Sequence, residues 1–188
     1  PSEELAKAVD GREVGACVVR GAVLPVHHAE AARRAARLVH ELDPVAVLHL
    51  GLAAGRARIA LERVAVNVMD YEIPDASGFR AAGEPCVAEG PGAYFSTLPL
   101  GAVLEALTAD GIPAYVSGTA GTYLCNQTMY STLHLLAGRG GVVPAGFVHL
   151  PMTPAMVAAA GVDEPSMDAS LMLRAVEVTL GVIARRLP

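Results

Sequence analysis

The sequence predicts a single α/β domain, a three-layer α/β/α sandwich in which helices cover both faces of a mostly parallel (mixed), twisted sheet. The 188 residues are 53% hydrophobic and 18% charged, which suffices for one sizeable core and argues against disorder. Apolar runs typical of strands alternate with segments whose apolar residues recur at helical spacing. Strands separated by single helices indicate this layered architecture. We find no repeat or second domain, and we expect one domain over residues 1–188.

The first half of the chain is expected to hold three strands, one helix and one long loop. Residues 16–26 are predicted as a strand with one Arg-Gly break, and residues 27–42 as a helix. Residues 44–50 form a continuous apolar run, typical of a strand buried on both faces. Residues 59–69 are predicted as a further strand. Chain-breaking residues concentrate in residues 73–92, which we expect to form a loop, and long loops are often functional.

The second half is expected to alternate helix and strand. Residues 97–110 are predicted as a helix and residues 112–116 as a strand. A turn of small residues follows, and the next helical pattern begins after Cys125. Residues 145–150 are predicted as a short strand that a proline ends, and residues 168–186 as the last helix.

Charge and composition exclude several classes of function. The net charge of −5 and the pI near 5.6 argue against a nucleic-acid partner. No apolar run approaches the roughly 20 residues that a membrane-spanning helix needs, and the first residues have no signal-peptide pattern. The three cysteines are widely spaced, without a metal or disulfide framework, so we expect a reducing cytoplasm.

Cys125 is the strongest candidate for chemistry, because it stands at a predicted strand-to-helix turn. Free backbone N–H groups and the positive end of the helix dipole lie at such a turn. This setting is expected to lower the pKa of the thiol and favour the nucleophilic thiolate. The same N–H groups can hold a developing oxyanion. The alternative is a buried cysteine that acts as a small apolar residue.

His149 is the candidate base, because it closes a predicted strand and ligands often bind beyond the carboxyl ends of parallel strands. Residues that end two such strands, here His149 and the turn before Cys125, are expected to meet there. The alternative is a hydrogen-bonded core histidine. That role is also expected of His49, and His134 lies too far along its helix to reach the thiol. Three histidines on or beside the first long helix are expected to be solvated: His27, His28 and His40.

Glu62 is the candidate acid that orients the base, because it is a charge within the apolar, strand-like residues 59–67. If buried, such a carboxylate must be paired or hydrogen-bonded. A salt bridge at a strand edge, with Arg63 or Arg56, is the alternative. Two loop residues are weaker candidates for the same role: Asp70 and Asp75.

These segments resemble pyroglutamyl-peptidase I, also called pyrrolidone-carboxylate peptidase, a family of cytosolic cysteine peptidases. GLAAGR (51–56) and LERVAVN (61–67) resemble the block that holds the family's catalytic Glu. TAGTYLCN (119–126) resembles its nucleophile block, and GFVHLP (146–151) its His block. The block AYFSTLP (93–99) and the spacing between blocks also agree. Several ordered blocks along nearly all of the chain are more specific than one motif.

The resemblance implies a triad of Cys125, His149 and Glu62 that removes an N-terminal pyroglutamyl residue from peptides. Cys125 would attack the carbonyl, His149 would take and return the proton, and Glu62 would orient His149. The intermediate would be a pyroglutamyl thioester that water hydrolyses.

The resemblance also implies the substrate site and the assembly. Leu52 backbone groups would bind the lactam amide, while Tyr123 and Leu124 would line the ring pocket. The substrates would be small peptides with N-terminal pyroglutamate, and the family needs no metal or cofactor. A homo-oligomer, often a tetramer, is implied, with no membrane or nucleic-acid partner.

Two departures from the family pattern concern the pocket. Members usually begin with a strand and a Gly-Phe-x-Pro-Phe-Gly loop, whereas this match begins at Pro1, so that strand and loop are expected to be missing before it. Glu72 stands where many members have an Arg near the oxyanion, so that role is not carried over.

Two alternatives from other classes share the predicted architecture, because fold alone does not fix function. A nucleoside phosphorylase-like enzyme would use residues 51–56 as a phosphate cradle and would leave Cys125 without a purpose. An inactive α/β binding protein is favoured if the loop before Pro1 is truly absent.

Overall fold

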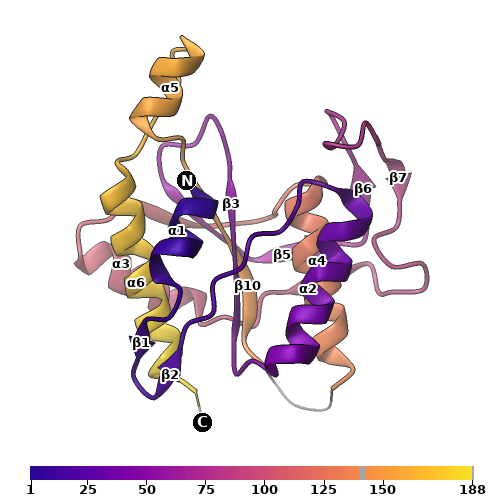
Figure 1. Ribbon diagram of the computed structural model, residues 1–188, viewed down its shortest axis with the longest axis horizontal. Coiled ribbons are helices and arrows are strands. Elements are labelled where there is room, and N and C mark those ends of the chain that lie inside the picture. The colour runs from indigo at the N-terminus through magenta and orange to yellow at the C-terminus, as the bar shows by residue number, and fades with distance from the viewer. Residues whose placement is uncertain (140–142, 188) are drawn as a thin grey trace.

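A four-stranded mixed sheet forms the centre of the computed structural model, which describes residues 1–139 and 143–187 (Figure 1). The strands lie in the order β3 (Val47–Leu52), β10 (Ala145–Leu150), β4 (Ile59–Glu62) and β9 (Ala114–Ser117). β10 is parallel to β3 and antiparallel to β4, while β4 is parallel to β9. The expected mixed sheet is therefore confirmed.

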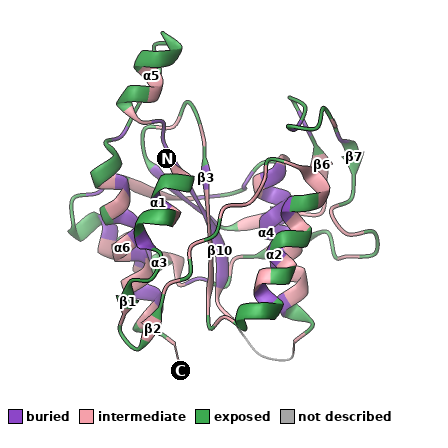
Figure 2. Ribbon diagram, in the orientation of Figure 1, coloured by how far each residue is buried: buried purple, intermediate pink, exposed green. Residues whose placement is uncertain are grey.

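Helices cover both faces of this sheet, which confirms the predicted three layers (Figure 1). One face carries α1 (Ser2–Val9), α3 (Leu100–Ala109) and α6 (Ala169–Ala184). The other carries α2 (His28–Leu42) and α4 (Leu124–Ala137). A further helix, α5 (Pro154–Ala160), projects from the body and has no buried residue (Figures 1 and 2). None of the helices in the described residues is long and apolar enough to cross a membrane.

Alternation along the strands divides the core into two parts. Leu61, Val148 and Leu150 point to the α1, α3 and α6 face, where they join the larger apolar cluster. Phe147 points to the other face and packs in a second cluster with Met129 of α4. Because side chains alternate with period two, His149 and Glu62 lie on the same face as Phe147. The sheet face under α4 therefore carries the chemistry-bearing side chains.

Three short two-stranded pairs surround the central sheet, and they correct the predicted strand lengths. They are β1 (Glu13–Val14) with β2 (Cys17–Val18), β5 (Val64–Val66) with β8 (Ala93–Phe95), and β6 (Met69–Asp70) with β7 (Ala82–Glu84). The single strand predicted over residues 59–69 is wrong, because the chain leaves the central sheet at Arg63. There its backbone N–H donates to Ser117 O at 3.0 Å and its C=O accepts from Ser96 N at 2.8 Å.

The strand predicted over residues 16–26 is also mostly wrong, since only two of its residues pair. The rest crosses α1 as irregular backbone, and a Cβ built at Gly21 would come within 2.1 Å of Ala6 O. Close backbone packing, which only a glycine permits, takes the place of strand pairing.

Capping signals account for the helix boundaries. α3 begins at residue 100, later than predicted, because Pro99 precedes it. Asp168 caps α6 by accepting from Ser170 N at 2.8 Å. Neither α1 nor α5 was predicted, although α5 has a Thr153 cap and ends at Gly161 in the left-handed region, with φ of 64°.

Candidate active site

Glu62 and His149 form a buried acid–base pair on the α4 face of the sheet. Glu62 is 0% exposed and His149 is 4% exposed. Their strands are antiparallel neighbours, with Phe147 opposite Glu62 and Ala60 opposite His149. The His149 ring donates from Nδ1 to Glu62 Oε1 at 2.7 Å. This bond leaves the other ring nitrogen, Nε2, for a second role.

Cys125 lies over the same strands, in the first turn of α4. A Cβ built at Gly51 would come within 3.0 Å of the Cys125 sulfur. Gly51 is the register partner of His149 in the parallel pair β3–β10, so both residues point to the same face of the sheet. The structure thus places the Cys125 sulfur against the face of the sheet that carries His149 and Glu62.

Cys125 and His149 do not meet at a shared carboxyl edge of parallel strands, so that part of the prediction was wrong. β9 is parallel to β4 and β10 is antiparallel to it, so β9 and β10 have their carboxyl ends at opposite edges of the sheet. Residues 118–123 instead carry the chain from the end of β9 onto the sheet face, where α4 begins. Helix docking, and not a shared strand edge, brings Cys125 to His149.

Glu62 also pairs with a cation. Arg56 Nη1 donates to Glu62 Oε1 at 2.7 Å, the same oxygen that the His149 ring uses. The hydrogen bond and the salt bridge that the sequence left as alternatives therefore both exist. Burial acts to raise the pKa of Glu62, but the donors around the carboxylate, first His149 and then Ser117 and Arg56, hold it below its usual value. Among the described residues, Glu62 Oε2 accepts no hydrogen bond. The neighbouring Ser117 hydroxyl donates to Thr119 O at 3.1 Å.

The thiol of Cys125 is not activated by its helix position, which corrects the sequence prediction. Burial and the negative charge of Glu62 raise the pKa of Cys125 to about 11, while the Arg56 charge acts in the opposite direction. Desolvation disfavours the thiolate more than the Arg56 charge and the Cys125 backbone N–H favour it. The thiol is therefore protonated at neutral pH, and it needs a base to become a nucleophile.

The start of α4 also offers hydrogen-bond donors. Its N-cap, Tyr123, has extended backbone and makes no side-chain cap bond. The first N–H groups of a helix have no partner within it, and Cys125 is the second residue of this one. Its N–H group is therefore available for a developing negative charge on a bound carbonyl.

The three residues expected to bind substrate lie around the same thiol. Leu52 follows Gly51 at the end of β3 and is 38% exposed. Tyr123 is partly buried, with its ring edge-on to Tyr71 at 4.6 Å and its hydroxyl donating to Pro74 O. Leu124 is buried against Tyr71 in a small apolar cluster. Leu52 and Tyr123 are thus the accessible members of this set.

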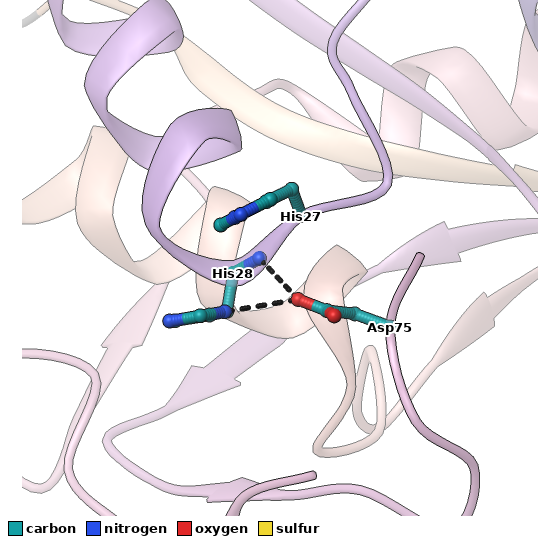
Figure 3. Close-up of side chains that lie close together, drawn as sticks. All are labelled: His27, His28 and Asp75. Atoms are coloured by element: carbon teal, nitrogen blue, oxygen red, sulfur yellow. Dashed lines mark hydrogen bonds and ion pairs between the residues drawn. The ribbon is translucent and has the colours of Figure 1, made fainter. Parts of the chain in front are cut away.

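A second histidine–carboxylate cluster lies at the start of α2, and the sequence analysis missed it (Figure 3). His27 and His28, expected to be solvated, are half-buried, and Asp75 is buried beneath them. His28 donates to Asp75 Oδ2 from its backbone N and its ring Nδ1, at 2.8 and 2.9 Å. Ser77 N, Ser77 Oγ and Phe79 N donate to Asp75 Oδ1. The Asp-x-Ser sequence of this turn was the signal that could have found it.

This cluster has the residue types of a metal site, with ligand atoms within 4.8 Å of one another. Its geometry fits a structural clamp better. The rings of His27 and His28 stack with an interplanar angle of 17°, so their in-plane lone pairs do not converge on one point. His27 Nδ1 accepts from Ala29 N, and both Asp75 oxygens are occupied.

The clamp holds the loop after β6 onto the start of α2, which also contacts α4, the helix that carries Cys125. The His28 ring stacks on Phe79 with centroids 3.8 Å apart. Gln127 of α4 donates to His28 O at 2.9 Å and accepts from the Tyr71 hydroxyl at 2.7 Å. Only Asn126 separates Gln127 from Cys125, so the clamp supports one side of the candidate site.

The remaining histidines behave as predicted or contact other surface residues. His49 Nε2 lies 2.9 Å from Thr132 Oγ1, and burial lowers the pKa of His49 to about 4. His134 Nδ1 lies within hydrogen-bond distance of the Tyr94 hydroxyl, at 2.9 Å, away from the thiol. His40 is exposed.

Comparison with known families agrees with this arrangement. The sequence profile of the family described as pyroglutamyl peptidase matches residues 1–186. The chain belongs to the pyroglutamyl peptidase family. This assignment confirms the resemblance and gives no support to a nucleoside phosphorylase-like protein.

Two relatives from this family align with the chain over most of their own length. The pyrrolidone-carboxylate peptidase of Pyrococcus furiosus is 41% identical, with 100% of this chain and 91% of that protein aligned. That of Klebsiella pneumoniae is 42% identical, over 99% of this chain and 86% of that protein.

Solved structures agree equally well with the fold. A mutant pyrrolidone carboxyl peptidase from P. furiosus superposes with a TM-score of 0.96 at 40% identity, covering 99% of this chain and 91% of that one. The Thermococcus litoralis pyrrolidone carboxyl peptidase gives 0.95 at 39% identity, covering 100% and 87%. The α/β fold described above is therefore the fold of this family.

Proposed function

We propose that the protein removes an N-terminal pyroglutamyl residue from peptides by thiol catalysis. One observation carries the proposal: the Cys125 sulfur lies against the strand pair that holds His149, whose Nδ1 is bound to buried Glu62. Nucleophile, base and orienting acid are the parts that a cysteine peptidase needs. The family membership supports the same activity.

In the proposed reaction, His149 Nε2 takes the thiol proton as the sulfur bonds to the carbonyl carbon that links pyroglutamate to the next residue. The Cys125 N–H stabilises the resulting oxyanion. When the oxyanion collapses, the C–N bond breaks, and the imidazolium gives its proton to the leaving amine. A pyroglutamyl thioester remains on the sulfur.

The second half of the reaction repeats these roles with water. His149 takes a proton from the water as its oxygen bonds to the thioester carbon. The C–S bond then breaks, the sulfur recovers the proton, and free pyroglutamate leaves. Glu62 holds the ring in the tautomer with Nδ1–H and stabilises the imidazolium in both halves.

The raised pKa of Cys125 decides how the thiol is activated. A thiol with a pKa of about 11 is not a preformed thiolate at neutral pH. His149 must therefore act as a general base during attack.

Substrate selection is proposed at the accessible residues beside the thiol. Pyroglutamate is small, uncharged and without a free amine, so an apolar site with a few amide contacts can select it. We assign the lactam amide to the Leu52 backbone at the end of β3. Tyr123 and Leu124 are assigned to the ring, Tyr123 as its accessible wall and Leu124 as its buried support.

The proposed setting is a reducing cytoplasm, with the protein as a homo-oligomer. Three free cysteines, one of them the proposed nucleophile, support the reducing compartment. Exposed large apolar residues, among them Phe95 at 67% and Ile73 at 63%, support self-association.

Hydrolysis of a pyroglutamyl-linked chromogenic amide tests the activity. The intact, reduced protein should release the chromophore, and Cys125→Ser should lose this activity by about 10³-fold or more. Cys17→Ser is the matched control, because Cys17 lies in β2 on the other side of the molecule, and it should keep full activity. Equal activity of wild type and Cys125→Ser would sink the thiol mechanism.

A further inference from the structure

Arg56 is the charged group of this site to which the proposed reaction gives no role. It lies in the connection between β3 and β4, and its Nη1 is 2.7 Å from Glu62 Oε1. Its side chain is 29% exposed, whereas that of Glu62 is 0% exposed. Arg56 therefore spans from solvent to the most deeply buried carboxylate of the site.

The buried Glu62 needs a cation whenever His149 is neutral. An ionised carboxylate without a compensating charge is costly in a dry environment. The neutral His149 ring supplies one hydrogen bond but no positive charge, and Glu62 Oε2 has no partner among the described residues. Arg56 supplies that charge permanently, because a guanidinium stays protonated.

Arg56 and His149 share one oxygen of Glu62, which has a geometric consequence. Both donors lie 2.7 Å from Oε1, so the guanidinium fixes the position of the atom that orients the ring. A carboxylate held by one partner alone could turn and bring Oε2 to the ring. With two donors on Oε1, rotation breaks two charge-assisted bonds instead of one.

The thiol feels both charges of this ion pair. Glu62 on β4 disfavours the thiolate of Cys125, and Arg56 favours it. The other titratable groups near the thiol are His149 on β10 and Tyr123 at the start of α4, and His49 lies on the same face of β3, two residues before Gly51. His49 is neutral over most of the pH range, so Arg56 is the permanent positive charge in this set.

We propose that Arg56 is a positioning residue of this site, which fixes Glu62 Oε1 against His149 and offsets the Glu62 charge at the Cys125 thiol. The inference rests on the proposed function for its importance to turnover. The geometry of the thiol, however, can be tested without any substrate.

The test measures the rate at which iodoacetamide alkylates Cys125, from about pH 6 to about pH 10, followed by mass spectrometry of the Cys125 peptide. Arg56→Met should slow alkylation at neutral pH by about tenfold and move the profile up by about one pH unit. Arg56→Lys keeps the charge and should stay within about threefold of wild type. Arg58→Met is the matched control, because Arg58 is exposed and lies over the Tyr115 ring, and it should not change the profile.

Turnover of the pyroglutamyl amide is the second measurement. Arg56→Met should lower kcat more than it raises KM, because Arg56 acts through Glu62 and not on the substrate. Arg56→Lys should recover alkylation more completely than kcat, since an ammonium retains the charge without the planar fork.

Two outcomes would overturn the proposal. One is an Arg56→Met profile that coincides with that of wild type in a folded protein. The other is an Arg56→Lys profile displaced upward by about one pH unit from that of wild type, an outcome that can be read even if Arg56→Met does not fold. Absence of amide hydrolysis in wild type, with the alkylation shift intact, would refute the proposed function and leave the charge effect of Arg56 standing.

Discussion

Two buried carboxylates among the described residues bind a histidine ring, and their surroundings differ. Glu62 accepts from His149 Nδ1 at 2.7 Å, and Asp75 accepts from His28 Nδ1 at 2.9 Å. Asp75 receives five hydrogen bonds, three of them from backbone N–H groups. Glu62 receives two, both on Oε1 and both from side chains.

This difference separates a structural pair from a reactive one. Burial acts to raise the pKa of Asp75, but hydrogen bonds from Ser77 and His28 outweigh it and hold the pKa well below its usual range. A carboxylate so fully satisfied gains little when its histidine becomes charged. Glu62 has fewer bonds and an unpartnered oxygen, so it responds more strongly to a charge on His149. The number of donors, and not the residue types, distinguishes the two pairs.

The largest expected effect comes from Glu62→Gln. The amide keeps the shape but cannot stabilise an imidazolium, and it leaves Arg56 beside a neutral group. We expect kcat to fall by about 10³- to 10⁴-fold. Initial rates on the pyroglutamyl amide measure this, with circular dichroism to check folding.

Glu105→Gln is the control for that change, because Glu105 is exposed on α3 at the other face of the sheet. Its rate should equal that of wild type. If Glu62→Gln kept more than about a tenth of the activity, the reactive pair would differ little from the structural one.

Gly51→Ala tests how closely the thiol must approach the pair. Its Cβ would lie 2.6 Å from the Phe147 ring and 3.0 Å from the Cys125 sulfur, so the sulfur must move. A displacement of this kind should lower kcat/KM by about 10²-fold, with a stability loss of about 1–3 kcal/mol. Gly101→Ala, which has open space around it, should cost nothing in either measurement. A fully active Gly51→Ala would show that the site tolerates a shifted thiol.

Asp75→Asn should act on stability more than on activity. The amide can accept on only one of its two polar atoms, so several donors of the turn and of His28 lose their partner. We expect Tm to fall by several degrees and kcat/KM by only a few-fold. Thermal melts and amide hydrolysis measure the two effects. Asp70→Asn, at an exposed position, is the control and should leave Tm unchanged.

The stability that Asp75 contributes is expected to fall as the solution becomes acidic. The pKa of Asp75 is lower in the folded protein than in the unfolded chain, so its contribution is complete above about pH 4 and is lost as pH falls further. Asp75→Asn should therefore flatten the pH dependence of unfolding in that range. An acid limb identical to that of wild type would contradict this role of the clamp.

His49 should give the smallest effect, at higher pH. Its pKa falls from 6.5 to about 4 on folding, so the unfolded chain binds a proton first and stability declines as pH falls between those values. His49→Gln can keep a bond to Thr132 and should remove this decline, as urea titrations would show. His40→Gln, at an exposed position, should retain it. The Asp75 limb should persist in both variants.

The sequence predicted the three residues of the candidate site but not the strand directions and the burial that bring them together. Cys125 was predicted from its strand-to-helix turn and His149 from its place at a strand end. Glu62 was predicted because it is a charged residue in an apolar, strand-like segment. Strand direction could not be read, since a short apolar run looks the same in parallel and antiparallel pairs. The raised pKa of Cys125 could not be read either, because desolvation depends on packing from distant segments.

The clamp was missed for a related reason. Asp75 and His28 are separated by 47 residues, and each has an ordinary local role in a turn and at a helix start. Only the tertiary structure shows that the loop folds back on α2. By contrast, Thr153 and Gly161 are cap signals that can be read from the sequence, and they could have predicted α5.

The antiparallel pairing of β4 and β10 divides the site into two mechanical parts. Glu62 and His149 are joined by a strand ladder through the centre of the sheet, and Cys125 arrives on a separate docked helix. Loosening of α4 would withdraw the thiol while the acid–base pair stayed assembled. Such a protein would keep its sheet and much of its hydrogen-exchange protection after it had become inactive. Its catalytic lifetime under heat or denaturant would then be set by the packing of α4 on the sheet and α2, and not by the unfolding of the whole domain.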